Sequence, residues 1–239
     1  MKGLKSGAVW PARIPRWLHP LLKVWWPGTL WSTSSPNAVH LTFDDGPDPG
    51  LTPWVLEQLR ARGMKATFFV VGDQAQRYPH VLEQVRNQGH TLGGHTMRHE
   101  HGWRTGLQEY VTSARQSMAV AGTSGVRQAG AGDAVAWFRP PYGKFTRAQA
   151  TALAPHATSV MWDVLSGDYA AKGQAGAEAV LERLKRHTRT GSIVVFHDSP
   201  KCAEVLHAVL PAYLDWLEAQ GWTSVALESA PKRRGMLRR

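Results

Sequence analysis

The sequence predicts a single-domain α/β fold in which about seven parallel strands alternate with helices. The chain has 239 residues, of which 43% are hydrophobic and 19% are charged, and these values are typical of one globular domain. From residue 39 onward, short runs of β-branched or aromatic residues alternate with helical patterns, as in a parallel sheet. The single cysteine, Cys202, excludes an internal disulfide and a cysteine zinc cluster.

Seven short apolar runs have the length and composition of buried strands. The expected strands are residues 39–43, 66–71, 91–93, 136–139, 159–162, 192–196 and 223–227. A stretch rich in Gly, Ala and Ser over residues 122–135 is predicted to be a loop before the fourth strand.

The helix after the first strand has the clearest predicted boundaries. Thr52 is a candidate cap, Pro53 suits the first helical position, and Gly63 supplies a left-handed residue that ends the helix. Four further helices are expected at residues 79–87, 107–120, 175–187 and 203–220.

Charge divides the chain, whose formal net charge is +10, into three parts. Five basic residues and no acidic residue precede Asp44, and five more basic residues lie within 231–239. The stretch from Asp44 to Ala230 contains 18 residues of each sign. We therefore expect an N-terminal segment over 1–37, a folded domain over 38–230 and a basic tail over 231–239. Because the domain itself is neutral, no nucleic-acid partner is expected.

The segment over residues 1–37 contains five of the 11 tryptophans, together with prolines and basic residues. Two interpretations stay open: it folds over the bottom of the domain with its tryptophans inward, or it contacts an anionic membrane surface together with the basic tail. Its prolines interrupt any signal-peptide core, and no apolar run is long enough to cross a bilayer. The expected location is the cytoplasm or the cytoplasmic face of the membrane, and the expected state is a monomer.

Residues able to do chemistry gather at one end of the predicted strands. Those at or just after the C-terminal end of a strand are Asp44, Asp45, His95, His99, Arg139, Tyr142, Asp163, Asp168, His197 and Asp198. In a parallel α/β barrel these ends share one face, where such enzymes build their sites. We therefore expect residues far apart in the sequence to converge there.

Three of these residues make a candidate metal site. His95 and His99 are four residues apart, and on a helical turn this spacing points both rings toward one cation. Asp45 adds a carboxylate, which gives a three-ligand site with open positions. Each motif also has a plain interpretation, because 11 histidines can produce such a pair by chance and Asp-Asp-Gly-Pro is an ordinary turn.

The neighbouring polar groups suit metal-assisted hydrolysis. Asp44 is a candidate base for water, Arg139 a candidate cation to orient that base, and His197 a candidate acid for the leaving group. Two histidines and a carboxylate also form the facial triad of non-haem iron oxygenases, but those enzymes generally have a β jelly-roll.

Five segments, in order, resemble the five motifs of the polysaccharide deacetylases, also called the NodB-homology domain or carbohydrate esterase family 4. The segments are TFDDGP at 42–47, HTMRH at 95–99, RPPYG at 139–143, DVLSGDY at 163–169 and VFH at 195–197. The resemblance implies a distorted seven-stranded (β/α) barrel that removes acetyl groups from N-acetylated sugars. It also implies one divalent metal ion, zinc foremost, with cobalt or another divalent ion as the alternative.

The resemblance implies a role for each matching residue. Asp45, His95 and His99 correspond to the metal ligands of the family. Asp44 corresponds to the catalytic base and His197 to the general acid.

Three further residues complete the implied catalytic set. Arg139 corresponds to the arginine that orients the base, and Asp168 to the aspartate that supports the acid. Tyr142 corresponds to the tyrosine whose backbone N–H stabilises the oxyanion.

The pocket for the acetyl group is expected to be lined by Tyr169, Val195 and Trp162. The family usually has Trp and Leu at the first two positions, so the size and polarity of the pocket differ here. The implied partner is an N-acetylated glycan such as chitooligosaccharide or peptidoglycan. Two alternatives stay open, namely an amidase of the same fold that acts on a non-sugar amide and a catalytically silent glycan-binding module.

Overall fold

The protein is described from a computed structural model, which covers residues 11–122 and 136–227. Its strands are β1 (Thr29–Leu30), β2 (Ala38–Asp44), β3 (Ala66–Val70), β4 (Thr91–Gly94), β5 (Ala136–Phe138), β6 (Ala157–Val160), β7 (Val164–Leu165), β8 (Ile193–His197) and β9 (Thr223–Ser224). They form one sheet in the order β1-β6-β5-β4-β3-β2-β8-β7, and β9 also pairs with β2. Every ladder between these strands is parallel.

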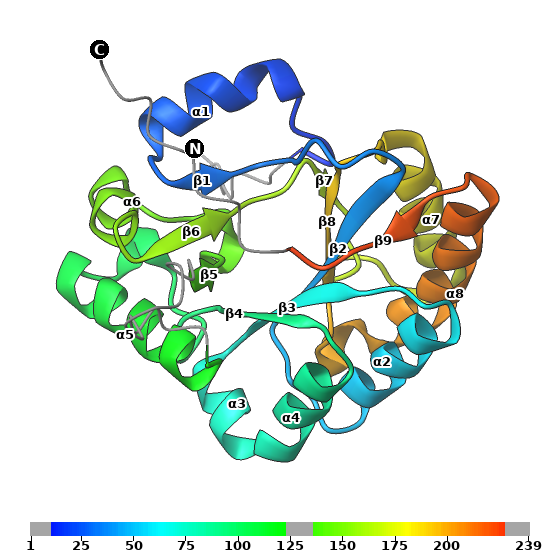
Figure 1. The fold of residues 1–239 in the computed structure, drawn as a ribbon, viewed down its shortest axis with the longest axis horizontal. Coiled ribbons are helices and arrows are strands. Elements are labelled where there is room, and N and C mark those ends of the chain that lie inside the picture. Colours follow the sequence, from blue (N-terminus) through cyan, green and yellow to red (C-terminus); the bar gives the residue numbers. More distant parts are fainter. Residues whose placement is uncertain (1–10, 123–135, 228–239) are drawn as a thin grey trace, which may run out of the picture.

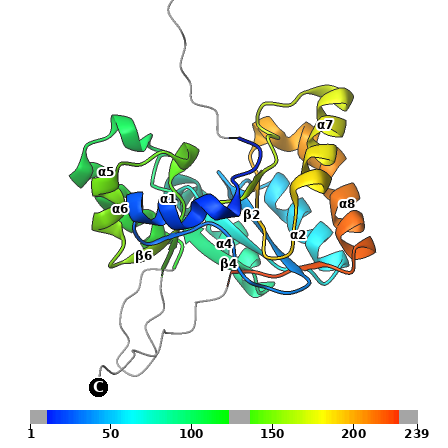
Figure 2. The same cartoon turned by 90° about the horizontal axis from the view of Figure 1, so that it is seen from above.

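Helices surround the curved sheet, as Figures 1 and 2 show. They are α1 (His19–Trp25), α2 (Leu51–Ala61), α3 (Gly72–Arg77), α4 (Pro79–Asn87), α5 (Leu107–Val120), α6 (Arg147–Leu153), α7 (Gly173–His187) and α8 (Ala203–Ala219). Short 3₁₀ turns are η1 (Arg16–Leu18), η2 (Gly102–Arg104), η3 (Pro141–Gly143) and η4 (Pro200–Cys202). The predicted single-domain α/β barrel with parallel strands is confirmed.

The seven expected strands are all present, with ends that differ by a few residues. Two strands were not predicted, β1 and β7, because two residues are too few to make a periodic pattern. The helices predicted at 79–87 and 107–120 have the observed bounds. The short helices α1, α3 and α6, of six or seven residues each, were not predicted.

The proposed cap of α2 was wrong. The N-cap position of this helix is Gly50, and Asp48, in the turn before it, accepts hydrogen bonds through Oδ1 from the N–H groups of Gly50 at 3.0 Å and Leu51 at 2.7 Å. Thr52 is buried inside the first turn of the helix. Gly63 does have the expected left-handed conformation, with φ +61°.

The N-terminal segment crosses the seam of the barrel between β6 and β8. β1 pairs with β6, and single bridges join Arg13 to Val164 and Ser32 to Ser192. Within the two described ranges, no ladder joins β7 to β6 or β1. Trp31 is buried in the core of the barrel, whereas Trp17 and Trp25 are exposed. The segment therefore lies along the seam with Trp31 buried, Trp26 packed against the core, and Trp17 and Trp25 facing outward.

Part of the sequence prediction lies outside the described residues. This is so for residues 1–10, for 123–135 of the expected loop and for the basic tail at 231–239. No helix in the described part of the chain is long and apolar enough to cross a membrane.

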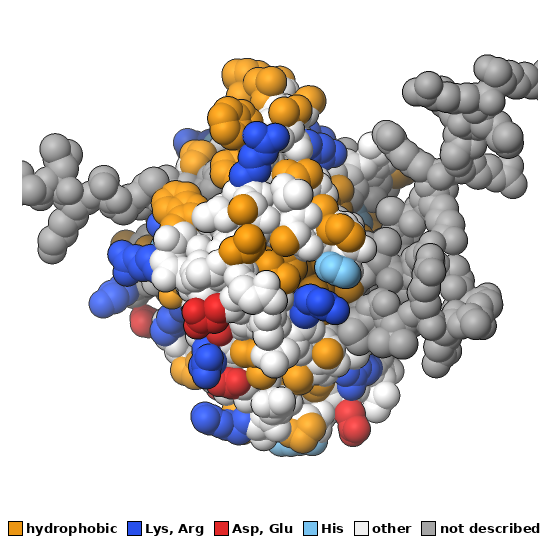
Figure 3. Space-filling view, turned by 90° about the vertical axis from the view of Figure 1, so that its left-hand side faces the viewer, with side chains coloured by type: hydrophobic (Ala, Val, Ile, Leu, Met, Phe, Trp, Pro, Cys, Tyr) orange, Lys and Arg blue, Asp and Glu red, His pale blue; other side chains and the backbone are white. Residues whose placement is uncertain are grey.

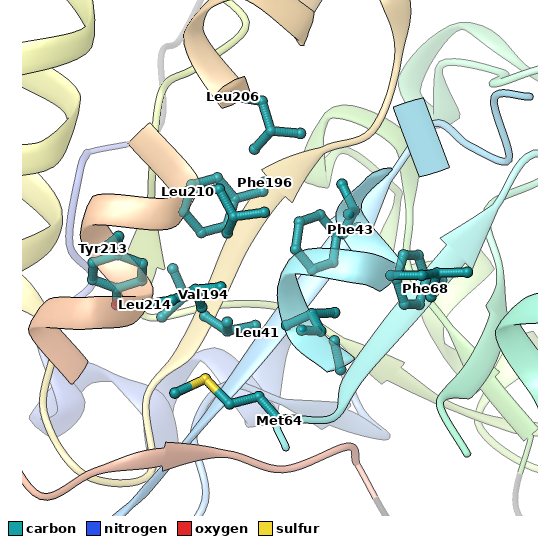
Figure 4. Close-up of a cluster of buried hydrophobic side chains, with 14 of the residues drawn as sticks. Leu41, Phe43, Met64, Phe68, Val194, Phe196, Leu206, Leu210, Tyr213 and Leu214 are labelled. Carbon is teal, nitrogen blue, oxygen red and sulfur yellow. The ribbon is translucent and has the colours of Figure 1, made fainter. Parts of the chain in front are cut away.

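Alternation along β2 separates the core from the site. Phe43 points outward, and its ring centroid lies 5.1 Å from that of Phe68 and 5.7 Å from that of Phe196. Figure 4 shows Phe196 beside Leu210 of α8, with Phe43 between Phe196 and Phe68. Thr42 and Asp44 point inward, where the Arg139 guanidinium contacts both. The strand thus supplies core and site residues from opposite faces.

Because Phe43 is fully buried in this cluster, Phe43→Ala is expected to lower the free energy of unfolding by about 3–5 kcal/mol. Denaturant unfolding followed by circular dichroism measures the loss. The exposed Leu107→Ala on α5 is the control and is expected to change stability by less than about 0.5 kcal/mol. A Phe43→Ala loss as small as that of the control would contradict the packing described here.

Candidate active site

Asp45, His95 and His99 converge beyond the C-terminal ends of β2 and β4. Asp45 Oδ1 lies 3.2 Å from His99 Nε2 and 3.7 Å from His95 Nε2. One ligand atom from each of the three residues lies within 4.8 Å of the others. Asp45 Oδ1 is buried and accepts no hydrogen bond. A buried carboxylate oxygen facing two imidazole nitrogens fits a divalent cation, and this donor set suits zinc.

The protonation states also fit a cation. His95 Nδ1 donates to the carbonyl of Arg139 at 2.8 Å, which leaves the lone pair of Nε2 facing Asp45. Burial lowers the pKa of His95 to about 4, so its ring is neutral. Burial alone would raise the pKa of Asp45, but the nearby His99 and His197 rings hold it well below its usual range.

The expected helical turn over residues 95–99 was wrong. Thr96 and His99 both have a left-handed φ of 60°, so the segment is an irregular loop. The two histidine rings still lie close together, with centroids 5.1 Å apart. The loop, and not helical periodicity, brings them to one point.

Arg139 fixes the carboxylate of Asp44 in the barrel interior. The Arg139 guanidinium is fully buried, and its Nη1 donates to Asp44 Oδ1 at 2.8 Å and to Thr42 Oγ1 at 2.6 Å. Nε and Nη2 donate to the carbonyls of Val160 and Met161. With each nitrogen bonded to the barrel, this cation holds Asp44 in one orientation.

His197 lies next to Asp44 on the neighbouring strand, because the two residues are partners in the register of β2 and β8. Its Nδ1 lies 2.7 Å from Asp168 Oδ1, and its backbone N–H donates to Asp168 Oδ2 at 2.8 Å. Burial alone would lower the pKa of His197, but the Asp168 carboxylate raises it to about 9. The ring is therefore protonated near neutral pH.

A cavity of about 330 Å³ connects these groups. Among the expected site residues, its lining includes Asp44, Asp45, His95, His99, Tyr142, Trp162, Tyr169, Val195 and His197. Arg139 and Asp168 do not line the cavity. Arg139 contacts the lining residue Asp44, and Asp168 contacts the lining residue His197. The structure thus places the residues with an implied metal, catalytic or acetyl-pocket role in the cavity or one contact away from it.

Two tyrosines form part of the cavity rim. The Tyr142 ring lies 4.4 Å from the His99 ring, and the Tyr142 backbone has a left-handed φ of 59°. The Tyr169 ring meets the His197 ring edge-on at 5.3 Å. Both side chains are roughly half exposed, so each is open to a bound molecule.

Asp163 does not reach the site, contrary to expectation. Its carboxylate accepts from the backbone N–H of Ile193 at 2.9 Å and from Ser192 at 3.1 Å. These two residues lie at the N-terminal end of β8, whereas His197 ends the strand. The chain continues from Asp163 into the unpredicted β7, so only Asp168, beyond β7, reaches the site.

Sequence reasoning missed two contacts of the site. Lys201 Nζ lies 2.8 Å from Asp45 Oδ2, which leaves Oδ1 to face the histidines. Asp198 accepts from the backbone N–H of Gly46 at 3.2 Å and from the Thr52 hydroxyl at 2.5 Å, and so holds the turn after Asp45. Asp198 was visible as a polar residue at a strand end, but no spacing in the sequence indicates either contact.

The fixed turn explains why residue 46 is glycine. A Cβ on Gly46 would overlap the carboxyl group of Asp198. Burial raises the pKa of that carboxyl to about 8. Asp198, which follows the candidate acid His197, is therefore packed against the turn next to the candidate metal ligand Asp45.

Asp168, His197 and Cys202 form a second group of potential metal ligands. Burial raises the pKa of the Cys202 thiol to about 12, so the thiolate that a metal needs is scarce. His197 Nδ1 is already engaged by Asp168. This second group fits a cation less well than Asp45, His95 and His99 do.

The chain is similar to known proteins over a large part of its length. A family model described as polysaccharide deacetylase matches residues 32–159. A peptidoglycan-N-acetylglucosamine deacetylase from Bacillus cereus is 32% identical over 163 residues, which are 68% of this chain and 56% of that protein. A chitooligosaccharide deacetylase from Sinorhizobium fredii is 32% identical over 70% of this chain and 74% of that protein.

A solved structure is similar over nearly the whole chain. It is the Bc1960 peptidoglycan N-acetylglucosamine deacetylase in complex with 4-naphthalen-1-yl-N-oxidanyl-benzamide. The TM-score is 0.74 and the sequence identity 26%, with 90% of this chain and 95% of that chain covered. The barrel fold is therefore shared with a solved deacetylase structure.

Asp45→Asn is expected to weaken zinc binding by roughly 100-fold, because the charged ligand oxygen that faces both histidines is replaced by a neutral amide. Competition with a chromogenic chelator measures the affinity of the purified proteins. Asp73→Asn, an exposed residue of a neighbouring groove, is the control and is expected to bind zinc as the wild type does. Equal affinity of Asp45→Asn and the wild type would rule out the ligand set.

Proposed function

The chain belongs to the polysaccharide deacetylase family, and we propose that it is a metal-dependent hydrolase that removes the acetyl group from N-acetylated sugars. The observation that carries the proposal is one cavity that holds a cation-ready trio, a carboxylate fixed by a buried arginine and a histidine with a raised pKa. Relatives named as peptidoglycan and chitooligosaccharide deacetylases support the same reaction. Each catalytic role below is part of this proposal.

The proposed ligands of the ion are Asp45, His95 and His99. A divalent ion, zinc foremost or else cobalt, supplies Lewis acidity, which acidifies water and polarises the acetamide carbonyl. Lys201 holds the second carboxylate oxygen of Asp45 and so keeps Oδ1 directed at the histidines. These contacts orient the ligand set before any ion arrives.

Asp44 is the proposed base. It lies at the end of β2 next to Asp45, and it lines the cavity. Because Arg139 and Thr42 fix the carboxylate, it takes a proton from water without a change of rotamer. The water oxygen then attacks the acetamide carbon.

His197 is the proposed acid. Its Nδ1 is hydrogen-bonded to Asp168, so the proton on Nε2 is the one available to the leaving nitrogen. Transfer of that proton to the departing amine releases acetate and a free amino sugar. The Tyr142 backbone N–H is the proposed donor to the oxyanion that forms on the carbonyl.

The acetyl group is proposed to lie against Trp162, Leu165 and Val195. These apolar side chains line the inner wall of the cavity and are almost fully buried. Tyr169 and Tyr142 at the rim offer ring faces to the pyranose. Such a pocket accepts a small apolar methyl group and leaves the sugar chain in solvent.

N-acetylglucosamine oligomers of graded length test the substrate class. Incubation with the zinc-loaded protein is expected to produce the mass loss of acetyl groups, to stop with a chelator, and to become faster as the oligomer lengthens. Two other functions predict different results. A silent glycan-binding module retains the oligomers unchanged, and an amidase for non-sugar amides leaves them acetylated while it cleaves its own substrate.

Asp44→Asn is expected to lower the rate of acetate release by about 10²- to 10⁴-fold, because the base is lost. Zinc affinity is expected to stay near that of the wild type, because Asp44 is not among the proposed ligands. An acetate-coupled assay and a chelator competition on the same sample measure both. Full activity of the zinc-loaded variant would show that another group is the base.

The pH dependence tests the acid. His197 carries its proton below a pKa of about 9 and loses it above, so kcat/KM is expected to fall on the alkaline side. Asp168→Asn removes the charge that raises this pKa, so the alkaline limb is expected to move to lower pH by about one to three units. A bound cation lowers the pKa of His197 in the wild type and in the variant alike. The test is therefore the difference between their two pH profiles.

Asp215→Asn is the control for this shift, because Asp215 is exposed on α8 and pairs with Arg62. It is expected to keep the wild-type pH profile. An alkaline limb that is unchanged in Asp168→Asn would exclude His197 as the acid.

A further inference from the structure

Four large apolar side chains lie exposed along one side of η1 and α1. Trp17, Leu21, Val24 and Trp25, here called the α1 face, are between 59% and 73% exposed. They recur at spacings of four, three and one residue, which places them on one side of a helix. They are half of the eight large hydrophobic residues exposed in the described part of the chain.

The α1 face lies on the outside of the barrel. Figure 2 shows α1 running across the side of the molecule between α6 and β2. In Figure 3, hydrophobic side chains with Lys and Arg beside them gather at the top of the molecule, where Figure 1 places α1. A contiguous apolar surface of this kind commonly marks an interaction site.

The helix cannot turn to bury this face, because its inner side is already fixed. Trp26 Nε1 donates to the carbonyl of Phe145 at 3.1 Å, and the two rings are stacked at 6.5 Å. The ring of the buried His19 lies 6.0 Å from that of Trp31. Arg16 Nη2 donates to the carbonyl of Thr190 at 2.8 Å. These contacts hold η1 and α1 against the barrel, so the α1 face stays exposed to solvent.

The rim of the α1 face is cationic. Lys23 is exposed within the helix, and the Arg147 guanidinium of α6 lies 6.0 Å from the Trp25 ring. No acidic residue occurs in the sequence before Asp44. Tryptophan and aliphatic side chains bordered by Lys and Arg are typical of helices that lie in a lipid interface.

We propose that the α1 face docks on a lipid bilayer with anionic headgroups, with Trp17, Leu21, Val24 and Trp25 at the boundary between headgroups and acyl chains. Its cationic rim is complementary to such headgroups. A second copy fits less well, because the chain carries a net charge of +10 and the same cationic rims would face each other. Docking through a folded helix differs from a contact made by the basic ends alone.

The α1 face is separate from the catalytic cavity. None of its four residues lines the 330 Å³ cavity. The proposal therefore does not depend on the proposed function, and vesicle binding is measured without any substrate.

The test compares the full chain with the triple variant Trp17→Gln, Leu21→Gln, Trp25→Gln. Both are sedimented with phosphatidylcholine vesicles, with and without phosphatidylglycerol. The wild type is expected to bind the vesicles that contain phosphatidylglycerol and to be weakened by salt. The triple variant is expected to lose at least about tenfold in partition coefficient, which corresponds to about 1.4 kcal/mol.

Leu107→Gln on α5 is the control, because it removes an exposed leucine, as Leu21→Gln does, but from another surface. It is expected to bind as the wild type does, and circular dichroism checks that all variants are folded. Three results would overturn the proposal: equal binding by the triple variant, no binding by the wild type, or a wild-type dimer in light scattering that the triple variant abolishes without any vesicle binding.

Discussion

The ion pair between Arg139 and Asp44 is the interaction on which the barrel interior and the candidate site both depend. Arg139 follows β5, is fully buried and reaches Asp44 on β2, while its other nitrogens bond to carbonyls beside β6. A buried guanidinium is stable only where each charge and donor is satisfied. The sheet order must therefore bring these three strands around one side chain, and the same contact orients the carboxylate at the site.

The strand register determines how close the proposed base, Asp44, lies to the proposed acid, His197. β2 lies between β3 and β8, and its last residue, Asp44, is the register partner of His197. Asp198 then bonds to Gly46 and so fixes the turn that carries Asp45. The proposed base, acid and metal ligand thus lie on one backbone unit of two adjacent strands. The positions of Asp44, Asp45 and His197 are therefore fixed by two paired strands and not by long, flexible loops.

The sequence predicted most of this arrangement because strand ends share one face in a parallel barrel. That rule placed Asp44, His95, Arg139 and His197 together, and it failed for Asp163, where a two-residue strand intervenes. Helical spacing gave the right pair of histidines for the wrong reason, since left-handed residues shape that loop. Contacts such as that of Lys201 with Asp45 depend on the tertiary path of the chain, which leaves no local pattern.

The proposed reaction requires that Asp45, His95 and His99 hold one divalent ion beside Asp44 and His197. Anomalous X-ray diffraction from crystals grown with zinc tests it most directly. One strong peak is expected in contact with Asp45 Oδ1, His95 Nε2 and His99 Nε2. A peak at Asp168, His197 and Cys202 instead, or no peak in the cavity, would contradict it.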